Sequence, residues 1–245
     1  MSFIICLLSG IATLLGLIPI FLKFKDIDLI ISVSLSFTAG VMICVSILDL
    51  IPEGLKLFNS YFNGLTNFLV CFLFIAFGIY IFYFVNKCLN FKNKDYYNND
   101  LYKIGLISMI AIIMHNIPEG IITFIASSSN LSLGLSLGLA IAIHNIPEGI
   151  SISVPIYYST LNRLKAFVYT FISSLSEIVG GLIAYFFLYK FINNFVVGAL
   201  FALVCGIMLG ITFNELIPNG FKNGFKVGVI SFFFGVIFFL IKFIL

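Results

Sequence analysis

The sequence predicts an all-α integral membrane protein with eight transmembrane helices. Of its 245 residues, 61% are hydrophobic and only 9% are charged, whereas a soluble domain carries about a quarter charged residues. Eight apolar runs follow one another along the chain, each close to the roughly 20 residues that cross a bilayer as a helix. The runs do not alternate between apolar and polar residues, as membrane-spanning strands would.

The eight runs fill the chain and leave no room for a large soluble domain. We place them at 2–22, 29–51, 65–89, 101–127, 131–158, 163–189, 194–218 and 225–245. The first run lacks a basic n-region and a small-residue cleavage signal, so we expect it to be a retained span. The whole chain, 1–245, is therefore expected to form a single transmembrane domain.

The distribution of basic residues predicts the orientation of these spans. The connections after the first, third, fifth and seventh runs carry Lys23, Lys25, Lys87, Lys92, Lys94, Lys103, Arg163, Lys165, Lys222 and Lys226. The opposite side carries only Lys56, Lys190 and Lys242. The positive-inside rule then puts both termini outside the cell. The net charge of +3 is too small and too spread out to indicate nucleic-acid binding.

A short pattern containing Ile-Pro-x-Gly recurs four times, at 49–54, 115–120, 144–149 and 215–220. Residues 40–42 also align with 206–208, and the same alignment, without gaps, pairs Asp49 with Glu215. Because the second and seventh runs have opposite directions in the predicted topology, these are inverted repeats, an architecture of many secondary transporters. We expect a 3+2+3 arrangement in which repeats of about 1–100 and 159–245 flank a central pair, 101–158.

The two central copies of the pattern carry the only histidines in the chain. Each copy reads His-Asn-Ile-Pro-Glu-Gly: His115, Asn116 and Glu119 in one, His144, Asn145 and Glu148 in the other. On a helix the glutamate lies about 40° from the histidine and the asparagine about 100° from it. If the helices face each other, one cluster combines both histidines with both glutamates, and a second combines both asparagines with the same glutamates.

Imidazole and carboxylate together suit divalent ions such as Zn²⁺, Fe²⁺, Mn²⁺ and Co²⁺. A carboxylate at the bilayer centre costs about 2.5–3.5 kcal/mol, and a bound cation would supply the missing charge. Glu177, in the sixth run, is a further candidate ligand, or else a hydrogen-bonded structural carboxylate. Asp49, Glu53, Asn214 and Glu215, nearer the span ends, are candidates for the pathway entrance and exit, or simple interfacial charges.

At these residues the sequence resembles the ZIP family (Zrt-, Irt-like proteins) of divalent-metal transporters, and most of all its bacterial ZupT/GufA-like branch. The resemblance rests on 115–120, 144–149, the Ser-Leu-Ser-Glu segment ending at Glu177, and 214–220. It implies eight spans in the 3+2+3 arrangement, usually a homodimer in the bacterial inner membrane. Two departures are Ile178, where the branch usually has proline, and a connection at 90–100 without histidine.

The resemblance also implies a binuclear centre bridged by Glu119 and Glu148. The implied metal ligands are His115, Asn116, Glu119, His144, Asn145, Glu148 and Glu177. The ions, two per protomer, are transported substrate, so no cofactor is expected. The expected partners are divalent metal ions, the lipid bilayer and a second copy of the chain, without nucleic acid.

We expect uptake of Zn²⁺ into the cytoplasm, with Fe²⁺, Mn²⁺, Co²⁺ or Cd²⁺ as further substrates. A transporter preferring iron or manganese is the alternative, and the residues do not separate a carrier from a channel. An intramembrane metal-dependent hydrolase needs His-Glu-x-x-His, which is absent from the sequence, so we do not expect an enzyme. A metal-responsive receptor would need a partner, because the chain has no soluble signalling domain.

Overall fold

The computed structural model describes residues 1–22, 26–89, 100–188, 193–222 and 224–241. All regular structure within these ranges is helical, as the sequence predicts. Most of the predicted connection 90–100 lies outside the described residues. The same holds for the basic residues Lys23, Lys25, Lys92, Lys94, Lys190 and Lys242.

The helices follow the order of the predicted runs. The first run forms α1 (Ser2–Ala12) and the 3₁₀ helix η1 (Thr13–Phe21), and the second forms α2 (Ile27–Cys44), the π-helix η2 (Val45–Leu50) and α3 (Ile51–Phe58). Next come α4 (Gly64–Leu89), α5 (Asp100–Ser129), α6 (Leu131–Thr160), and α7 (Arg163–Ile183) with the π-helix η3 (Ala184–Leu188). The last two runs form α8 (Asn194–Ile211), the π-helix η4 (Thr212–Leu216), α9 (Ile217–Lys222) and α10 (Phe225–Leu240).

Seven continuous helical stretches of the described chain are long and apolar enough to cross a membrane. The eighth predicted span corresponds to α10, which is apolar but has only 16 helical residues. The described residues therefore contain seven to eight long apolar helices.

Polar residues in the short connections start several of these helices. The side chains of Asp26, Asn130, Asn162 and Asn193 each accept a hydrogen bond from the backbone N–H three residues later, at 3.0–3.2 Å. This is the usual N-cap contact, which satisfies a donor that the first helical turn leaves free. The caps at Asn130 and Asn162 allow α5, α6 and α7 to follow one another with very short connections.

Two helical stretches extend beyond their predicted ends. The second continues past Ile51 through Pro52 to Phe58, and the seventh continues past Pro218 to Lys222. In both, a π-helical segment stands directly before a new α-helix whose second residue is the proline. Proline is tolerated in the first turn of a helix because its missing N–H is not needed there. In both stretches a new α-helix therefore begins just before the proline, where the sequence predicted a connection.

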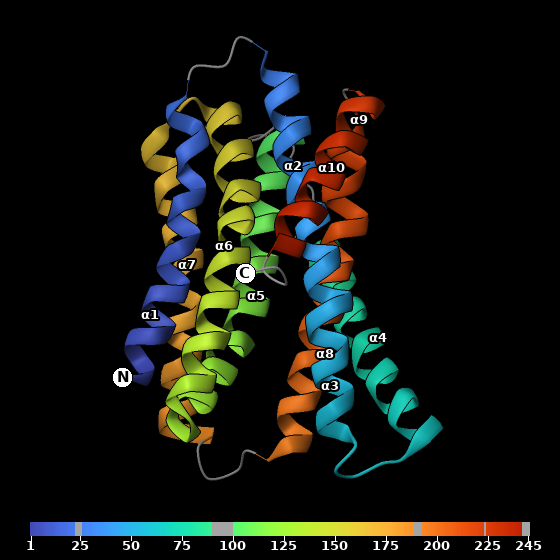
Figure 1. Cartoon of the computed structure of the whole chain (residues 1–245). Coiled ribbons are helices and arrows are strands. Elements are labelled where there is room, and N and C mark those ends of the chain that lie inside the picture. Colours follow the sequence, from blue (N-terminus) through green and yellow to red (C-terminus); the bar gives the residue numbers. More distant parts are fainter. Residues whose placement is uncertain (23–25, 90–99, 189–192, 223, 242–245) are drawn as a thin grey trace.

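The helices pack as two bundles that lie side by side (Figure 1). The first contains α1 with η1, α5, α6 and α7, and the second contains α2 with α3, α4, α8 with α9, and α10. The bundles contact each other mainly where α2 packs on α6 and α8 packs on α5. The two central helices, α5 and α6, thus lie along the junction between the bundles.

Glycines allow very close helix crossings within the first bundle. A Cβ on Gly120 of α5 would collide with the carbonyl oxygen of Glu177, and a Cβ on Gly180 of α7 would lie 3.1 Å from the Cα of Gly120. A Cβ on Gly149 of α6 would collide with the carbonyl oxygen of Thr13 and would lie 3.2 Å from the Cα of Gly16. The glycine that ends each central motif therefore allows a neighbouring helix to lie directly against the helix that carries the candidate metal ligands.

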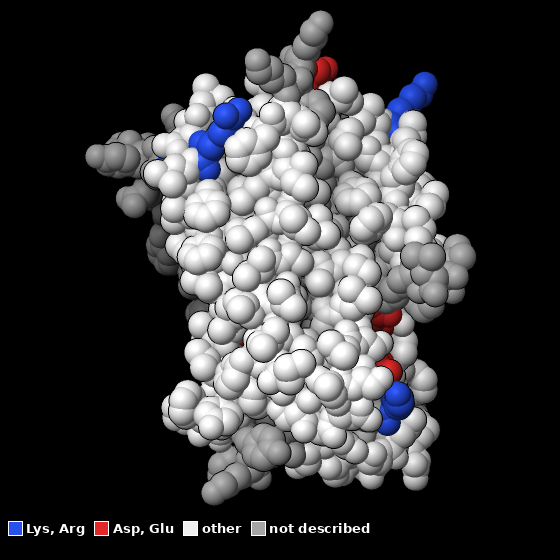
Figure 2. All heavy atoms as spheres, turned by 60° about the vertical axis from the view of Figure 1, so that its left-hand side comes forward, with Lys and Arg blue, Asp and Glu red and all other residues white. Residues whose placement is uncertain are grey.

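The molecular surface is apolar over most of its height. Figure 2 shows charged side chains towards the two ends and along one edge, with a broad uncharged area between them. Large hydrophobic residues stand exposed on α4, including Leu65 at 75% and Phe72 at 71%. Large contiguous apolar surface is rare on monomeric soluble proteins, and it fits helices that are long and apolar enough to cross a membrane.

Gly180 and its neighbour Gly181 provide a matched test of the α5–α7 crossing. An alanine at Gly180 would force two backbones apart, and overpacking of this kind costs about 1–3 kcal/mol. An alanine at Gly181 would lie 3.4 Å from the Cys6 sulfur, an ordinary contact. Thermal unfolding of the purified protein should therefore show a lower midpoint for Gly180→Ala and a midpoint at or above wild type for Gly181→Ala. Equal midpoints would contradict the close crossing.

Candidate metal site

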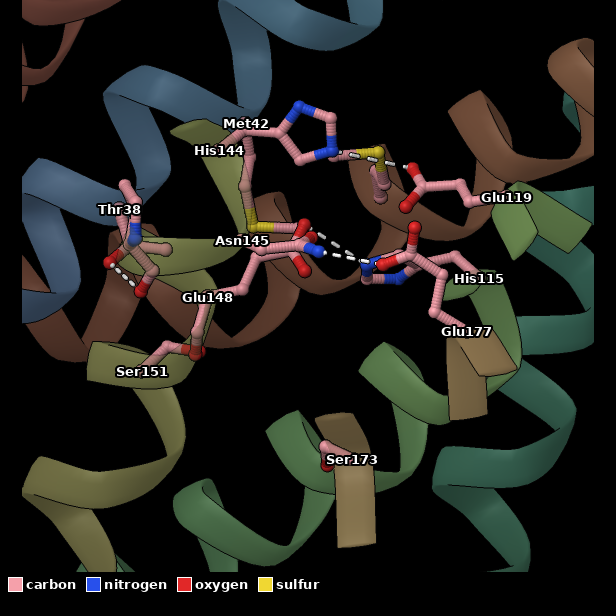
Figure 3. Close-up of polar contacts among 12 residues, drawn as sticks. Thr38, Met42, His115, Glu119, His144, Asn145, Glu148, Ser151, Ser173 and Glu177 are labelled. Carbon is pink, nitrogen blue, oxygen red and sulfur yellow. Dashed lines mark hydrogen bonds and ion pairs between the residues drawn. The ribbon is translucent and has the colours of Figure 1, made fainter. Parts of the chain in front are cut away.

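The two central motifs face each other in the middle of α5 and α6 (Figure 3). These helices run in opposite directions because a single residue, Asn130, separates them. Their facing sides carry four buried side chains, with exposed fractions of 0% for His115, 3% for Glu119, 5% for His144 and 0% for Glu148. The two histidines and two glutamates are therefore all buried, and they form two His–Glu pairs between the helices.

Each histidine lies against the glutamate of the opposite helix. The distance from His115 Nε2 to Glu148 Oε1 is 3.1 Å, and that from His144 Nε2 to Glu119 Oε1 is 3.6 Å. The partners are not the glutamates four residues along the same helix. Each carboxylate therefore lies on the helix of one histidine and in reach of the other histidine.

Several buried polar atoms of the site have no hydrogen-bond partner within the described residues. They include both oxygens of Glu119, Oε2 of Glu148, both amide atoms of Asn116 and the side-chain oxygen of Asn145. Leaving a buried polar group unpaired costs about 1–3 kcal/mol. Carboxylate and amide oxygens are metal ligands, and imidazole is another. The donor set therefore fits a divalent cation.

The His and Glu side chains do not by themselves form a closed metal shell. Across the described parts of the chain, no three His, Cys, Asp or Glu residues are grouped so that they could hold one ion. The two His–Glu pairs are separate contacts. A complete shell would need the asparagine oxygens, water or a movement of these side chains.

Glu177 of α7 lies beside Asn145, and both of its carboxylate oxygens are hydrogen-bonded. Asn145 Nδ2 donates to Glu177 Oε2 at 3.0 Å, and the Ser9 hydroxyl of α1 donates to Glu177 Oε1. Ser9 is not among the site residues predicted from the sequence. Its only signal is a polar residue beside a glycine within the apolar run of the first span.

A pocket of about 630 Å³ leads from this site towards one end of the bundle. Its lining includes His144 and Glu119 at the site, and Asp49, Glu53 and Lys56 farther along. Much of the rest is apolar surface of α5, α6 and α8. Two of the predicted pathway residues, Asp49 and Glu53, thus share a pocket with the candidate metal ligands.

The other two predicted pathway residues, Asn214 and Glu215, are hydrogen-bonded in the second bundle. Asn214 Oδ1 accepts from the Tyr83 hydroxyl at 2.8 Å, and Glu215 Oε1 accepts from Asn86 Nδ2 at 3.2 Å. Neither residue is part of the pocket lining. The two predicted ends of the pathway therefore have different environments.

Comparison with known proteins identifies the chain's relatives. A family model described as "ZIP Zinc transporter" matches residues 92–242. The zinc transporter ZupT of Chlorobaculum parvum is 37% identical over 202 residues, which covers 76% of this chain and 75% of the relative. The corresponding protein of Streptococcus mutans is 35% identical over 197 residues, with the same coverages of 76% and 75%. That of Campylobacter jejuni is 32% identical over 215 residues, covering 74% of each chain.

These relatives are bacterial proteins, and the described chain contains seven helices of membrane-spanning length. The protein is accordingly a multi-pass protein of the bacterial cell membrane. The matches cover both central motifs and most of the chain. The chain therefore belongs to the ZIP family of zinc transporters.

Proposed function

We propose that this protein takes up Zn²⁺, or a related divalent metal ion, into the cytoplasm through the site between α5 and α6. The observation that carries the proposal is the pair of crossed His–Glu contacts at the inner end of a pocket that reaches the bundle end. Its similarity to proteins named zinc transporters supports the same substrate class. Transport, and no chemical conversion, is the proposed activity.

The proposed site holds two ions, with Glu119 and Glu148 as bridges. A bridging carboxylate must lie between the other ligands of both ions. The crossed contacts support this role, since each glutamate approaches the histidine of the opposite helix. The unpaired oxygens of Glu119 and Glu148 supply the remaining acceptors. The full proposed ligand set is His115, Asn116, Glu119, His144, Asn145, Glu148 and Glu177.

An inverted repeat within a single domain of residues 1–245 is part of the proposal. The π-helices η2 and η4 occur at the aligned positions before Pro52 and Pro218, which supports a 3+2+3 arrangement of eight spans. The matching glycine crossings of α5 with α7 and of α6 with η1 support it independently. Assembly as a homodimer stays an expectation from the family resemblance.

The proposed topology has both termini outside, and it orients the pathway. The pocket lined by Asp49 and Glu53 would then open to the outside, and metal would leave past Asn214 and Glu215. Acidic side chains along such a pocket raise the local concentration of cations. In an alternating-access cycle, this conformation would be the one that accepts metal from outside.

Radiolabelled Zn²⁺ uptake into proteoliposomes tests the proposed function. Wild type should show saturable uptake, and Glu119→Ala and Glu119→Gln should reduce it to the level of empty liposomes, because both remove a bridging carboxylate. Ser127→Ala is a matched control on α5, since this hydroxyl donates only to its own helix, at Thr123 and Phe124. Competition by unlabelled Fe²⁺, Mn²⁺ and Cd²⁺ ranks the substrates and tests the iron- or manganese-preferring alternative. A purified wild type that binds metal but moves none would overturn the proposal.

Removal of an acidic side chain and removal of a basic side chain along the pocket should change the KM of uptake in opposite directions. Two unit charges about 10 Å apart in water interact by roughly 0.4 kcal/mol, a factor of about two in affinity. Asp49→Asn should raise the KM about two- to five-fold, and Lys56→Gln, which removes the positive partner of Glu53 at 3.2 Å, should lower it. Both effects should shrink at high ionic strength. A shift of both variants in the same direction would count against entry through this pocket.

A further inference from the structure

The amide of Asn145 is anchored on its nitrogen side. Nδ2 donates one hydrogen to the backbone carbonyl of Ser9 at 2.9 Å and the other to Glu177 Oε2 at 3.0 Å. A flipped amide would point its oxygen at these two acceptors, which is unfavourable. The side-chain oxygen must therefore point away from them, and it is buried without a hydrogen-bond partner among the described residues.

Ser9 contacts both members of this pair. Its hydroxyl has one proton, and its nearest acceptor is Glu177 Oε1, closer than the carbonyls of Ile5 at 2.9 Å and Cys6 at 3.3 Å. Its backbone carbonyl accepts from Asn145. One residue of α1 thus holds a carboxylate of α7 and an amide of α6.

The Ser9 carbonyl lies just before a change of helix type. Here α1 gives way to the 3₁₀ helix η1 at Thr13, and the backbone N–H groups at the junction bond to Gly10 and Ile11. A carbonyl oxygen has two lone pairs, so the Ser9 carbonyl can accept from Asn145 within the helix. The nearby Gly10 also lets α1 approach Glu177, since a Cβ there would lie 3.3 Å from the Glu177 Cβ.

The other half of the site has no such anchor. Thr13 is the counterpart of Glu177 in that half. The Thr13 carbonyl oxygen faces Gly149, as the Glu177 carbonyl oxygen faces Gly120. Thr13 Oγ1 and both amide atoms of Asn116 have no hydrogen-bond partner within the described residues. The two asparagines therefore differ, and only the orientation of Asn145 is determined before metal binds.

We propose that Ser9 is a positioning residue that preorganises the side-chain oxygen of Asn145 as a metal ligand. This inference rests on the proposed function, which makes Asn145 a ligand. An oxygen ligand matters more to Mn²⁺ than to the softer Cd²⁺. Ser9 is thereby also a determinant of metal preference. Loss of a residue that orients a metal ligand typically weakens binding about 10–100-fold.

Equilibrium binding of Mn²⁺ and of Cd²⁺ to the purified full chain in detergent tests this role. Ser9→Ala keeps the backbone carbonyl but removes the hydroxyl that holds Glu177, the other acceptor of Asn145 Nδ2. It should weaken Mn²⁺ binding by about tenfold or more and Cd²⁺ binding much less, with a matching change in the Mn²⁺ paramagnetic resonance spectrum. Ser9→Thr keeps the hydroxyl and should restore Mn²⁺ binding. The matched control is Ser153→Ala, which removes another contact between α6 and the first span, Ser153 Oγ to the Gly16 carbonyl at 2.6 Å. It should bind both ions as wild type does.

The outcomes separate this inference from the proposed function. If Ser9→Ala binds both ions as wild type does, or loses both equally, the positioning role is wrong, even where wild type takes up Zn²⁺ and Glu119→Ala does not. If wild type moves no metal, the proposed function fails, whereas a selective loss of Mn²⁺ binding in Ser9→Ala still supports the role of Ser9. A wild type that binds neither ion overturns both.

Discussion

The central constraint on this structure is the burial of two carboxylates, Glu119 and Glu148, inside an apolar bundle. The ion pairs of the described residues give them only the histidines of the opposite helices as partners. Both oxygens of Glu119 and Oε2 of Glu148 accept no hydrogen bond from the described residues. Such groups are costly in a membrane protein, and a bound cation at the proposed site would offset that cost.

The packing of the first bundle serves this arrangement. The motif glycines Gly120 and Gly149 let α7 and η1 approach the central helices until backbone touches backbone. That approach brings Glu177 and Ser9 into hydrogen-bond contact with Asn145 or with each other. The second bundle contributes Asp49 and Glu53 to the pocket instead. One bundle therefore carries the candidate ligands, and a pocket at the junction with the other reaches two of them, Glu119 and His144.

Features of the fold and the site that depend on local sequence pattern could be predicted from the sequence. The apolar runs predicted an all-helical membrane fold, and the spacing of His115 and Glu119 predicted one ligand face on a helix. The crossed pairing with α6 depends on how two helices are rotated against each other, which no local pattern specifies. The continuation to Phe58 was missed because a proline after a π-helix can restart a helix. Ser9 was missed because its partners are more than 130 residues away in the chain.

Anomalous X-ray scattering at the zinc absorption edge, from crystals of the metal-loaded protein, would locate Zn²⁺ directly and so test whether it binds between α5 and α6. We expect anomalous peaks between α5 and α6, within coordination distance of His115 or His144 and of the carboxylates of Glu119 and Glu148. Peaks found only at the acidic residues of the pocket mouth, with none between the central helices, would contradict this expectation.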